Sequence, residues 1–332
     1  MNGRTLLGLL ALVVLGLLAW ELRWVLLVLF GAVVLAVALD VPVSLLRRVL
    51  PLPRPLALLI VLVTLGVLGW NLGGVLLPDL IAQANEFTRL APILLQRLSH
   101  FASEVPALHS LEQQITSLAS WDKLQPLGSQ LLGFAGGAAN STIQLLLMVL
   151  LAILLALDPR SHQRLVLAAT PNAYRPLMAQ LLADCRQALG GWLAGMTISA
   201  SSVFLFTWAG LAALKVPLAL LSALVCGLLT FVPTIGPTVA TLLPLAMALL
   251  VSPAKVAQVF VLRMVLQNGE AFLLTPILLS RTVNLLPTVA LMSQLCLGAL
   301  LGLPGVLLAL PGVVVLQVIA QKVLVEQIMD RW

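Results

Sequence analysis

The chain contains 332 residues, of which 61% are hydrophobic and only 9% are charged. Soluble domains carry about 25% charged residues, so this composition excludes an ordinary soluble enzyme or binding domain and predicts an integral membrane protein. The formal net charge of +6 does not itself indicate an orientation in the membrane. Orientation follows from how the basic residues are distributed between the two sides of the bilayer. The cysteines Cys185, Cys226 and Cys296 are isolated, which predicts apolar packing rather than a metal site or a disulfide framework.

Uncharged runs of membrane length recur along the chain, since a spanning helix needs about 20 apolar residues. They are 6–20, 24–39, 55–78, 124–157, 187–214, 216–254 and 282–321. The first two are short for complete spans. Trp20 and Trp24 bracket Glu21 and Arg23, which predicts a hairpin tip at the membrane interface. The first run lacks a signal-peptide cleavage site at the usual distance, so we expect a retained helix.

The last two runs each contain two elements, divided at 233–237 and at 303–305, and a further apolar element covers 255–274. We therefore expect an all-α polytopic protein with roughly eight to ten membrane elements, some of them broken or re-entrant helices. Its parts are N-terminal membrane helices at 1–77, an extramembrane region at 78–137, and a transport core at 138–332 with a cytoplasmic linker at 158–188.

The region 78–137 contains an amphipathic helix with an apolar seam. Its apolar residues recur at alternating spacings of four and three, the pattern of a heptad seam. They are Leu80, Ala84, Phe87, Ala91, Leu94, Leu98 and Phe101. Such a helix packs on another helix of the chain, on a neighbouring subunit or on the membrane surface. Helix packing is favoured, because basic residues do not dominate the polar face.

Basic residues are more numerous on one side when the elements alternate from a cytoplasmic N-terminus. The inner set is Arg4, Arg47, Arg48, Arg54, Arg160, Arg164, Arg175, Arg186, Arg281, Lys322 and Arg331. The outer set is Arg23, Arg89, Arg97, Lys123, Lys215 and Lys255. The bias predicts cytoplasmic termini, with 78–137 on the outer side.

The uncharged run 216–254 is interrupted at its middle by Pro233, Thr234, Gly236 and Pro237. Proline removes a backbone donor and clashes with the preceding helical turn. Irregular backbone survives at membrane depth only where protein or a wet cavity covers it, so such a break points to a transport site. The alternative is a tight turn between two spans.

Glu270 is the strongest candidate for an ionisable group in the transport pathway, because a charge at membrane depth is costly and usually faces a cavity. Gln267 and Arg263 share its helical face. Arg263 and Glu270 are about 10.5 Å apart along an ideal helix, so they meet only through side-chain reach, Gln267 or water. The alternative is a structural ion pair at a helix end. Thr275 and Pro276 then break the backbone, and a new element begins at Pro287.

No catalytic arrangement is present in the sequence. The histidines, His100, His109 and His162, lie in the polar regions without a metal-ligand partner at helical spacing, and no glycine-rich phosphate loop with lysine occurs. We therefore expect neither an enzyme nor a cofactor, and any movement of solute must use a gradient or a partner.

The ordered motifs resemble one family. They are VPLA at 216–219, FVPTIGP at 231–237, Glu270 with LTP at 274–276, VNLLP at 283–287, GLPG at 302–305 and ALP at 309–311. This set is similar to the autoinducer-2 exporter family of membrane transporters, also called PerM-like permeases. The chain departs from the family pattern at Thr234, Met196, Ser280 and Leu286. Leu286 stands where histidine is common, which leaves Glu270 as the sole titratable candidate there.

The resemblance implies export of autoinducer-2 in some members and sodium or lithium/proton antiport in others, and it suggests a homo-oligomer. We expect a multi-pass secondary transporter of the bacterial inner membrane that exports a small polar solute and has no nucleic-acid partner. Its pathway would run along 233–237 and 275–287, which includes Asn284, with sodium or a proton as the coupling ion at Glu270. The alternatives are a sodium(lithium)/proton antiporter and a membrane scaffold that moves nothing.

Overall fold

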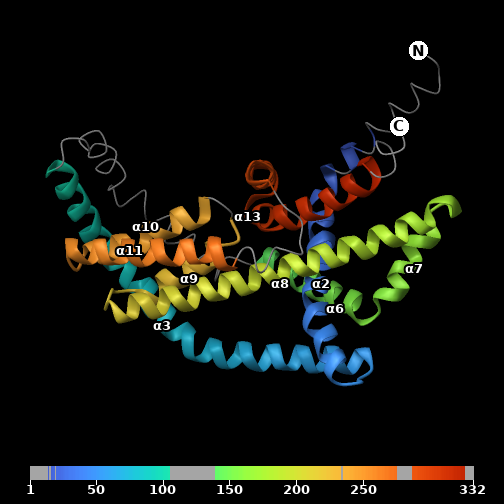
Figure 1. Cartoon of the computed structure of the whole chain (residues 1–332), viewed down its shortest axis with the longest axis horizontal. Helices are drawn as coiled ribbons and strands as arrows, with labels where there is room; N and C mark the ends of the chain where they lie inside the picture. The colour runs from blue at the N-terminus through green and yellow to red at the C-terminus, as the bar shows by residue number, and fades with distance from the viewer. Residues whose placement is uncertain are drawn as a thin grey trace, which may run out of the picture. The chain divides into compact units, whose positions relative to one another are not determined.

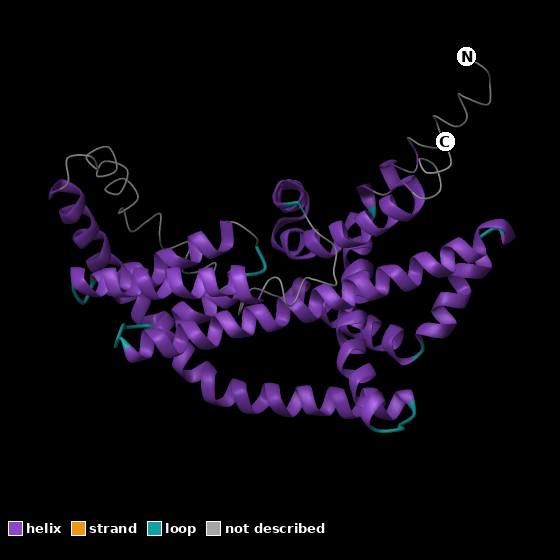
Figure 2. Ribbon diagram, in the orientation of Figure 1, coloured by secondary structure: helices purple, strands orange, loops and turns teal. Residues whose placement is uncertain are grey.

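The structure is a computed structural model that describes residues 14, 16–18, 20–104, 139–232, 235–274 and 286–325. Helices joined by short turns make up these ranges, and no strand occurs within them (Figure 2). The predicted all-α class is therefore confirmed. The predicted site residues Pro233, Thr234, Thr275, Pro276 and Asn284 lie outside the described residues.

The helices are labelled in Figure 1. They are α2 (Arg23–Val49), α3 (Arg54–Glu104), α6 (Ala139–Leu157), α7 (Pro159–Ala169), α8 (Arg175–Ala213), α9 (Ala219–Leu229), α10 (Ile235–Leu249), α11 (Pro253–Gly269) and α13 (Pro287–Ile319). A 3₁₀ turn covers Asn172–Tyr174, and π-helical turns follow α11 at Glu270–Leu274 and α13 at Ala320–Val325.

Four helical segments are long and apolar enough to cross a membrane: Arg23–Val49, Arg54–Leu94, Asn172–Ala213 and Pro304–Val323. The pair Ile143–Leu157 and Pro159–Ala169, bent by 89°, would be a fifth if it forms one span. Shorter apolar helices occupy Ala219–Leu229, Gly236–Leu249 and Thr288–Gly302. These segments fit a polytopic membrane protein with broken helices. The membrane boundaries of 1–77, 78–137 and 138–332 stay predictions.

The chain divides into two compact units. Unit 1 contains Met1–Val61, Asn140–Trp192 and Thr288–Trp332, and unit 2 contains Leu62–Ala139 and Leu193–Pro287. Unit 1 therefore holds α2, α6, α7, most of α13 and the beginnings of α3 and α8. Unit 2 holds α9, α10, α11 and the remaining parts of α3 and α8. The described transport candidates Gly236, Pro237, Arg263, Gln267 and Glu270 belong to unit 2.

One turn residue, Leu22, precedes α2, but backbone hydrogen bonds of helical spacing continue across it, so the predicted hairpin tip is wrong. The backbone N–H of Leu22 donates to the carbonyl of Leu18, and that of Leu26 donates to the carbonyl of Leu22. The charged side chain of Arg23 is accommodated on the helix surface. It donates to the carbonyl of Trp20 and lies 4.7 Å from the centre of the Trp20 ring. Because this cation–π contact accommodates the charge of Arg23, the charge does not require a turn in the backbone.

The amphipathic part of α3 packs on its own chain, within unit 2. Leu94 is buried with Met247 and Val259, and Phe87 packs against the same cluster. Two polar side chains of α3 also form hydrogen bonds with backbone groups at the ends of other helices. Such groups lack partners within their own helix. Gln83 accepts a hydrogen bond from the backbone N–H of Leu221 in the first turn of α9. Arg97 donates to the carbonyls at 249 and 250, at the end of α10.

The predicted division near 303–305 is confirmed by a kink inside α13. Gly302 has φ of 66° and ψ of −150°, a conformation that L side chains rarely adopt. Immediately beyond it, a Cβ built on Gly305 would lie 2.1 Å from the carbonyl oxygen of Leu297. The glycines at this break are therefore required by backbone geometry.

Candidate functional site

The candidate site is built from four helical segments of unit 2. Its first part is the break between α9 and α10. The backbone N–H of Val232 donates to the carbonyl of Leu229, and that of Gly236 donates to the carbonyl of Val232. A Cβ on Gly236 would lie 1.9 Å from the Leu229 oxygen. Glycine is therefore needed for the backbone of α10 to begin this close to the end of α9.

The break is held next to α8 by close helix packing. A Cβ on Gly227 of α9 would lie 3.1 Å from the carbonyl oxygen of Ala200 and 3.0 Å from the Cβ of Phe204. On the other side, the buried Cys226 donates through its Sγ to the carbonyl of Ala240 in α10, at 3.4 Å. α9 thus fixes both α8 and α10 around the same buried centre.

Arg263 of α11 lies at this centre, with only 4% of its surface exposed. Its Nη1 donates to Thr207 Oγ1 of α8 at 3.0 Å, and its Nε donates to Thr241 Oγ1 of α10 at 3.2 Å. Thr241 in turn donates to the carbonyl of Pro237, in the first turn of α10. One guanidinium therefore ties three helices together and reaches the break through Thr241. A buried charge requires such partners, because it is costly to remove from water.

Glu270 lies at the point where α11 changes to a π-helical turn. It is half-buried, and its carboxylate accepts a hydrogen bond from the hydroxyl of Ser199 on α8. Ser199 is 9% exposed. π-helical turns inside helices are frequent at functional sites, because they redirect side chains that a regular helix would hold on another face.

The two polar contacts between α8 and α11 form an antiparallel pattern. Ser199 pairs with Glu270, and Thr207 pairs with Arg263. Ser199 and Thr207 are about 12 Å apart along α8, and Arg263 and Glu270 are about 10.5 Å apart along α11, at 1.5 Å per residue. Because these separations are similar, both contacts fit in one interface between the two helices. The Glu270 carboxylate and the Arg263 guanidinium are each hydrogen-bonded to a hydroxyl of α8. Gln267 lies between them on α11 and is half-buried.

Comparison with known proteins identifies the family. The profile of the AI-2E family transporter matches residues 9–324. The chain belongs to the AI-2E transporter family. Two Bacillus subtilis (strain 168) proteins, both named for an inferred role in transport, are also similar. YrrI is 25% identical over 149 residues, and YueF is 21% identical over 239 residues.

These alignments cover 45% and 70% of the chain, and 42% and 63% of YrrI and YueF. The chain therefore spans about half the length of the relatives that it matches. The predicted resemblance, which the motifs at 216–311 carry, is confirmed by the match over residues 9–324. Membership of the AI-2E family places the chain in a family of membrane transporters.

Sequence reasoning selected Arg263 and Glu270 but missed Ser199, Thr207 and Thr241, the hydroxyls to which they bond. It also missed Asp40 in α2, which is 9% exposed and pairs with two arginines of unit 1. A signal was present in each case. Ser199 and Thr207 are eight residues apart on an apolar helix, and Asp40 follows an uncharged run and precedes a basic cluster.

Proposed function

We propose that this AI-2E family protein is a gradient-driven exporter of a small polar solute such as autoinducer-2 or a related metabolite. The observation that carries the proposal is the buried Arg263, bonded to α8 and α10 beside the broken backbone of α9 and α10. Placing a charged guanidinium among apolar membrane helices is unfavourable in free energy. It is best explained by a polar solute that must pass there.

The break supplies further polar groups for a solute. Helix ends leave amides and carbonyls without intrahelical partners, and broken helices in transporters use such groups to bind substrates and ions. α10 begins at the break, so its first amides and its positive dipole end are at the same place. A small polyol or carbonyl compound would accept hydrogen bonds from these amides and from Arg263.

Glu270 is the proposed coupling group. Its carboxylate and the Ser199 hydroxyl are oxygen ligands, which suit a proton or a sodium ion. Protonation or ion binding at Glu270 would change its bond to α8 and so loosen one of the two contacts between α8 and α11. Arg263 and Gln267 would tune this exchange from the same face of α11.

The same oxygen pair favours a second candidate function, sodium(lithium)/proton antiport without any organic solute. For both transport functions we propose a location in the bacterial inner membrane and a homo-oligomeric assembly. A scaffold that transports nothing is the alternative from another class.

Flux measurements on proteoliposomes separate these functions. Purified protein is reconstituted, and uptake or efflux of autoinducer-2, of small polyols and of sodium is followed under an imposed proton or sodium gradient. Export predicts gradient-dependent solute movement, antiport predicts sodium movement alone, and a scaffold predicts none. Absence of gradient-driven flux of every solute and ion tested would reject the transport proposal.

Glu270→Gln tests the coupling role, because glutamine keeps the shape and polarity of the side chain but cannot release a proton. Glu86→Gln is the matched control, since Glu86 is an exposed acid of α3 in the same unit. We expect gradient-driven flux to collapse in Glu270→Gln and to persist in Glu86→Gln, with equal membrane insertion. Unchanged rate and pH dependence in Glu270→Gln would make Glu270 a structural residue.

A further inference from the structure

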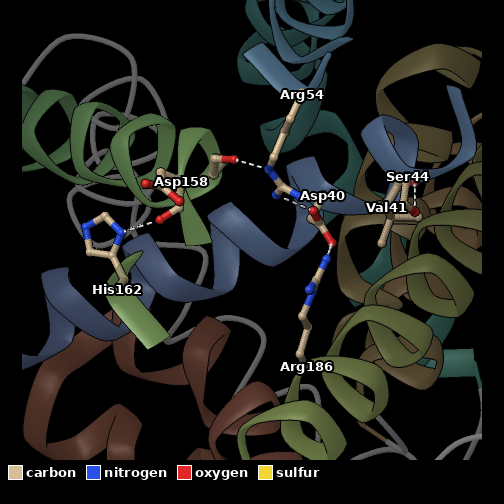
Figure 3. Close-up of polar contacts among 8 residues, drawn as sticks. Asp40, Val41, Ser44, Arg54, Asp158, His162 and Arg186 are labelled. Carbon is tan, nitrogen blue, oxygen red and sulfur yellow. Dashed lines mark hydrogen bonds and ion pairs between the residues drawn. The ribbon is translucent and has the colours of Figure 1, made fainter. Parts of the chain in front are cut away.

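A second polar centre lies in unit 1, away from the residues assigned to transport. Asp40 of α2 is nearly buried and receives two guanidinium groups (Figure 3). Arg54, the first residue of α3, donates its Nη2 to Asp40 Oδ1, and Arg186 of α8 donates its Nε to Asp40 Oδ2 at 3.0 Å. One carboxylate thus faces two cations, which leaves the group with a net positive charge.

The carboxylate fixes the positions of these arginines. Arg54 also donates its Nε to the carbonyl of Ala156, at the end of α6, at 2.8 Å. Its side chain is 20% exposed, whereas that of Arg186 is 41% exposed. Both guanidinium groups are therefore held in place by protein, while part of each still reaches solvent. Arginines positioned in advance lose little conformational entropy when they bind a ligand.

A cavity of about 430 Å³ opens beside this pair. Its size falls in the range of small-molecule sites, about 300–1,000 Å³. Two further arginines line it, Arg47 of α2 and Arg160 of α7, together with Gln163. Neither Arg47 nor Arg160 forms an ion pair with any residue in the described ranges. The cavity therefore has four guanidinium groups around it, two of them without a counter-charge.

Asp158 also lines the cavity, but its carboxylate is already engaged. It caps α7 by accepting hydrogen bonds from the backbone N–H and the hydroxyl of Ser161. Even with Asp158 and Asp40 both ionised, the four arginines leave an excess of positive charge. The beginning of α7 adds the positive end of a helix dipole at the same place.

We propose that this arginine cavity, lined by Arg47, Arg54, Arg160, Arg186 and Gln163, binds a phosphate group. A planar guanidinium matches two oxygens of a phosphate, and a doubly charged anion balances the two unpaired arginines. Gln163 supplies a neutral donor that would fix its orientation. The phosphate could belong to an anionic lipid headgroup or to a soluble phosphate ester. Basic pockets between helices near a membrane surface suit the former.

A pair of double variants tests the cavity without disturbing the Asp40 pairing. Arg47→Gln/Arg160→Gln removes the two unpaired arginines that line it. Arg48→Gln/Arg164→Gln removes the same charge from exposed arginines on the same two helices that do not line it. Unfolding temperatures of both variants equal to that of the parent protein, measured without ligand, would establish that their folds are intact.

Two ligand arms are then measured on the full-length protein at constant ionic strength. One titrates inorganic phosphate and glycerol 3-phosphate, and the other titrates short-chain phosphatidylglycerol against phosphatidylcholine. We expect a saturable rise in unfolding temperature in one arm, with affinity weaker by about tenfold or more in Arg47→Gln/Arg160→Gln and unchanged in the control, because two charge-assisted contacts are lost. The arm that responds identifies the source of the phosphate.

Two results would overturn the proposal. No saturable stabilisation in either arm would show that the cavity binds no phosphate. An equal loss of affinity in both double variants would assign the binding to general surface charge rather than to the cavity.

Discussion

Gly236 approaches the carbonyl oxygen of Leu229 so closely that a Cβ on residue 236 would lie 1.9 Å from that oxygen. The neighbouring atom is backbone, so it cannot move aside as a flexible side chain would. The turn between α9 and α10 therefore depends on the absence of a side chain at this position. The same relationship recurs between Gly305 and Leu297 at the kink of α13.

Gly236→Ala should consequently lower stability, although alanine favours helix elsewhere. Relief of the clash requires a backbone shift, and overpacking of this kind costs about 1–3 kcal/mol. Gly69→Ala in α3 is the control, because open space surrounds a Cβ at Gly69. The measurement is the apparent unfolding temperature of the purified variants. Gly236→Ala should fall below the parent and Gly69→Ala should not; equal values would contradict the close approach.

Thr207→Val tests the buried contacts of Arg263. Valine keeps the shape of threonine but removes the hydroxyl that accepts from Arg263 Nη1. Loss of a hydrogen bond to a charged group costs about 1.5–3 kcal/mol, so the unfolding temperature should fall. Ser222→Ala is the control. The Ser222 hydroxyl is buried and has no hydrogen-bond partner among the described residues, so its removal should cost little.

The two single changes can be combined with Arg263→Gln in a double-mutant cycle. Thr207→Val should have a smaller effect when Arg263 is already replaced, because the two residues share one interaction. An effect of Thr207→Val equal to that of Ser222→Ala, or full additivity with Arg263→Gln, would mean that the Arg263 contact contributes nothing to stability.

The breaks in the helices could be predicted from the sequence, but the partners of the buried charges could not. Proline and glycine act on their own backbone, so the divisions at 233–237 and 303–305 are local properties. Hydroxyls in apolar helices have two ways to be satisfied. Thr197 and Thr230 donate to a carbonyl of the preceding turn, whereas Thr207 accepts from Arg263 on another helix. Sequence alone does not separate these cases.

Charge was also misleading as a marker of helix ends. α2 runs through Asp40 because Arg54 and Arg186 provide counter-charges from other segments. The chain does not reverse at Glu21, and the guanidinium of Arg23 donates to the carbonyl of Trp20, just before α2. A sequence analysis that ends each membrane segment at a charged residue misses both cases. The ion pairs of Asp40 come from distant segments, and the contact of Arg23 depends on local backbone geometry.

The topology predicted from the basic residues places residues 110 and 168 on opposite sides of the membrane. In a variant without the native cysteines, Ser110→Cys should react with an impermeant maleimide from outside the cell. Ala168→Cys should react only after permeabilisation, because the basic residues of Arg160–Arg186 predict an inner location for this segment. Labelling of Ser110→Cys only after permeabilisation and of Ala168→Cys from outside would mean that the predicted topology is inverted.

A third position, Asn2→Cys, tests how often the chain crosses the membrane before Arg47. The helical path past Glu21 leaves no reversal of direction at that point. If the chain crosses the bilayer once before Arg47, Asn2→Cys should be labelled from the side opposite to Ala168→Cys. Labelling of both from the inside would restore two crossings before Arg47 and the cytoplasmic N-terminus that charge counting predicts.

Asp40→Asn should destabilise the protein more than the loss of any exposed acid. Asparagine keeps the size of the side chain but removes its charge, so Arg54 and Arg186 would face each other without compensation. Because these groups are partly buried, we expect a loss of about 1–3 kcal/mol. The measurement is the change in unfolding temperature, or in free energy where unfolding is reversible.

Asp184→Asn provides the matched control, since Asp184 also pairs with one basic residue of unit 1. Its carboxylate is 3.0 Å from the Lys322 ammonium, but its side chain is 43% exposed against 12% for Asp40. Exposed pairs contribute about 0–1 kcal/mol and weaken in salt, so Asp184→Asn should have a small, salt-dependent effect. If Asp40→Asn destabilises no more than Asp184→Asn, the arginines beside the cavity are not held by Asp40. The pre-ordering on which phosphate binding depends would then have to come from the backbone carbonyls alone.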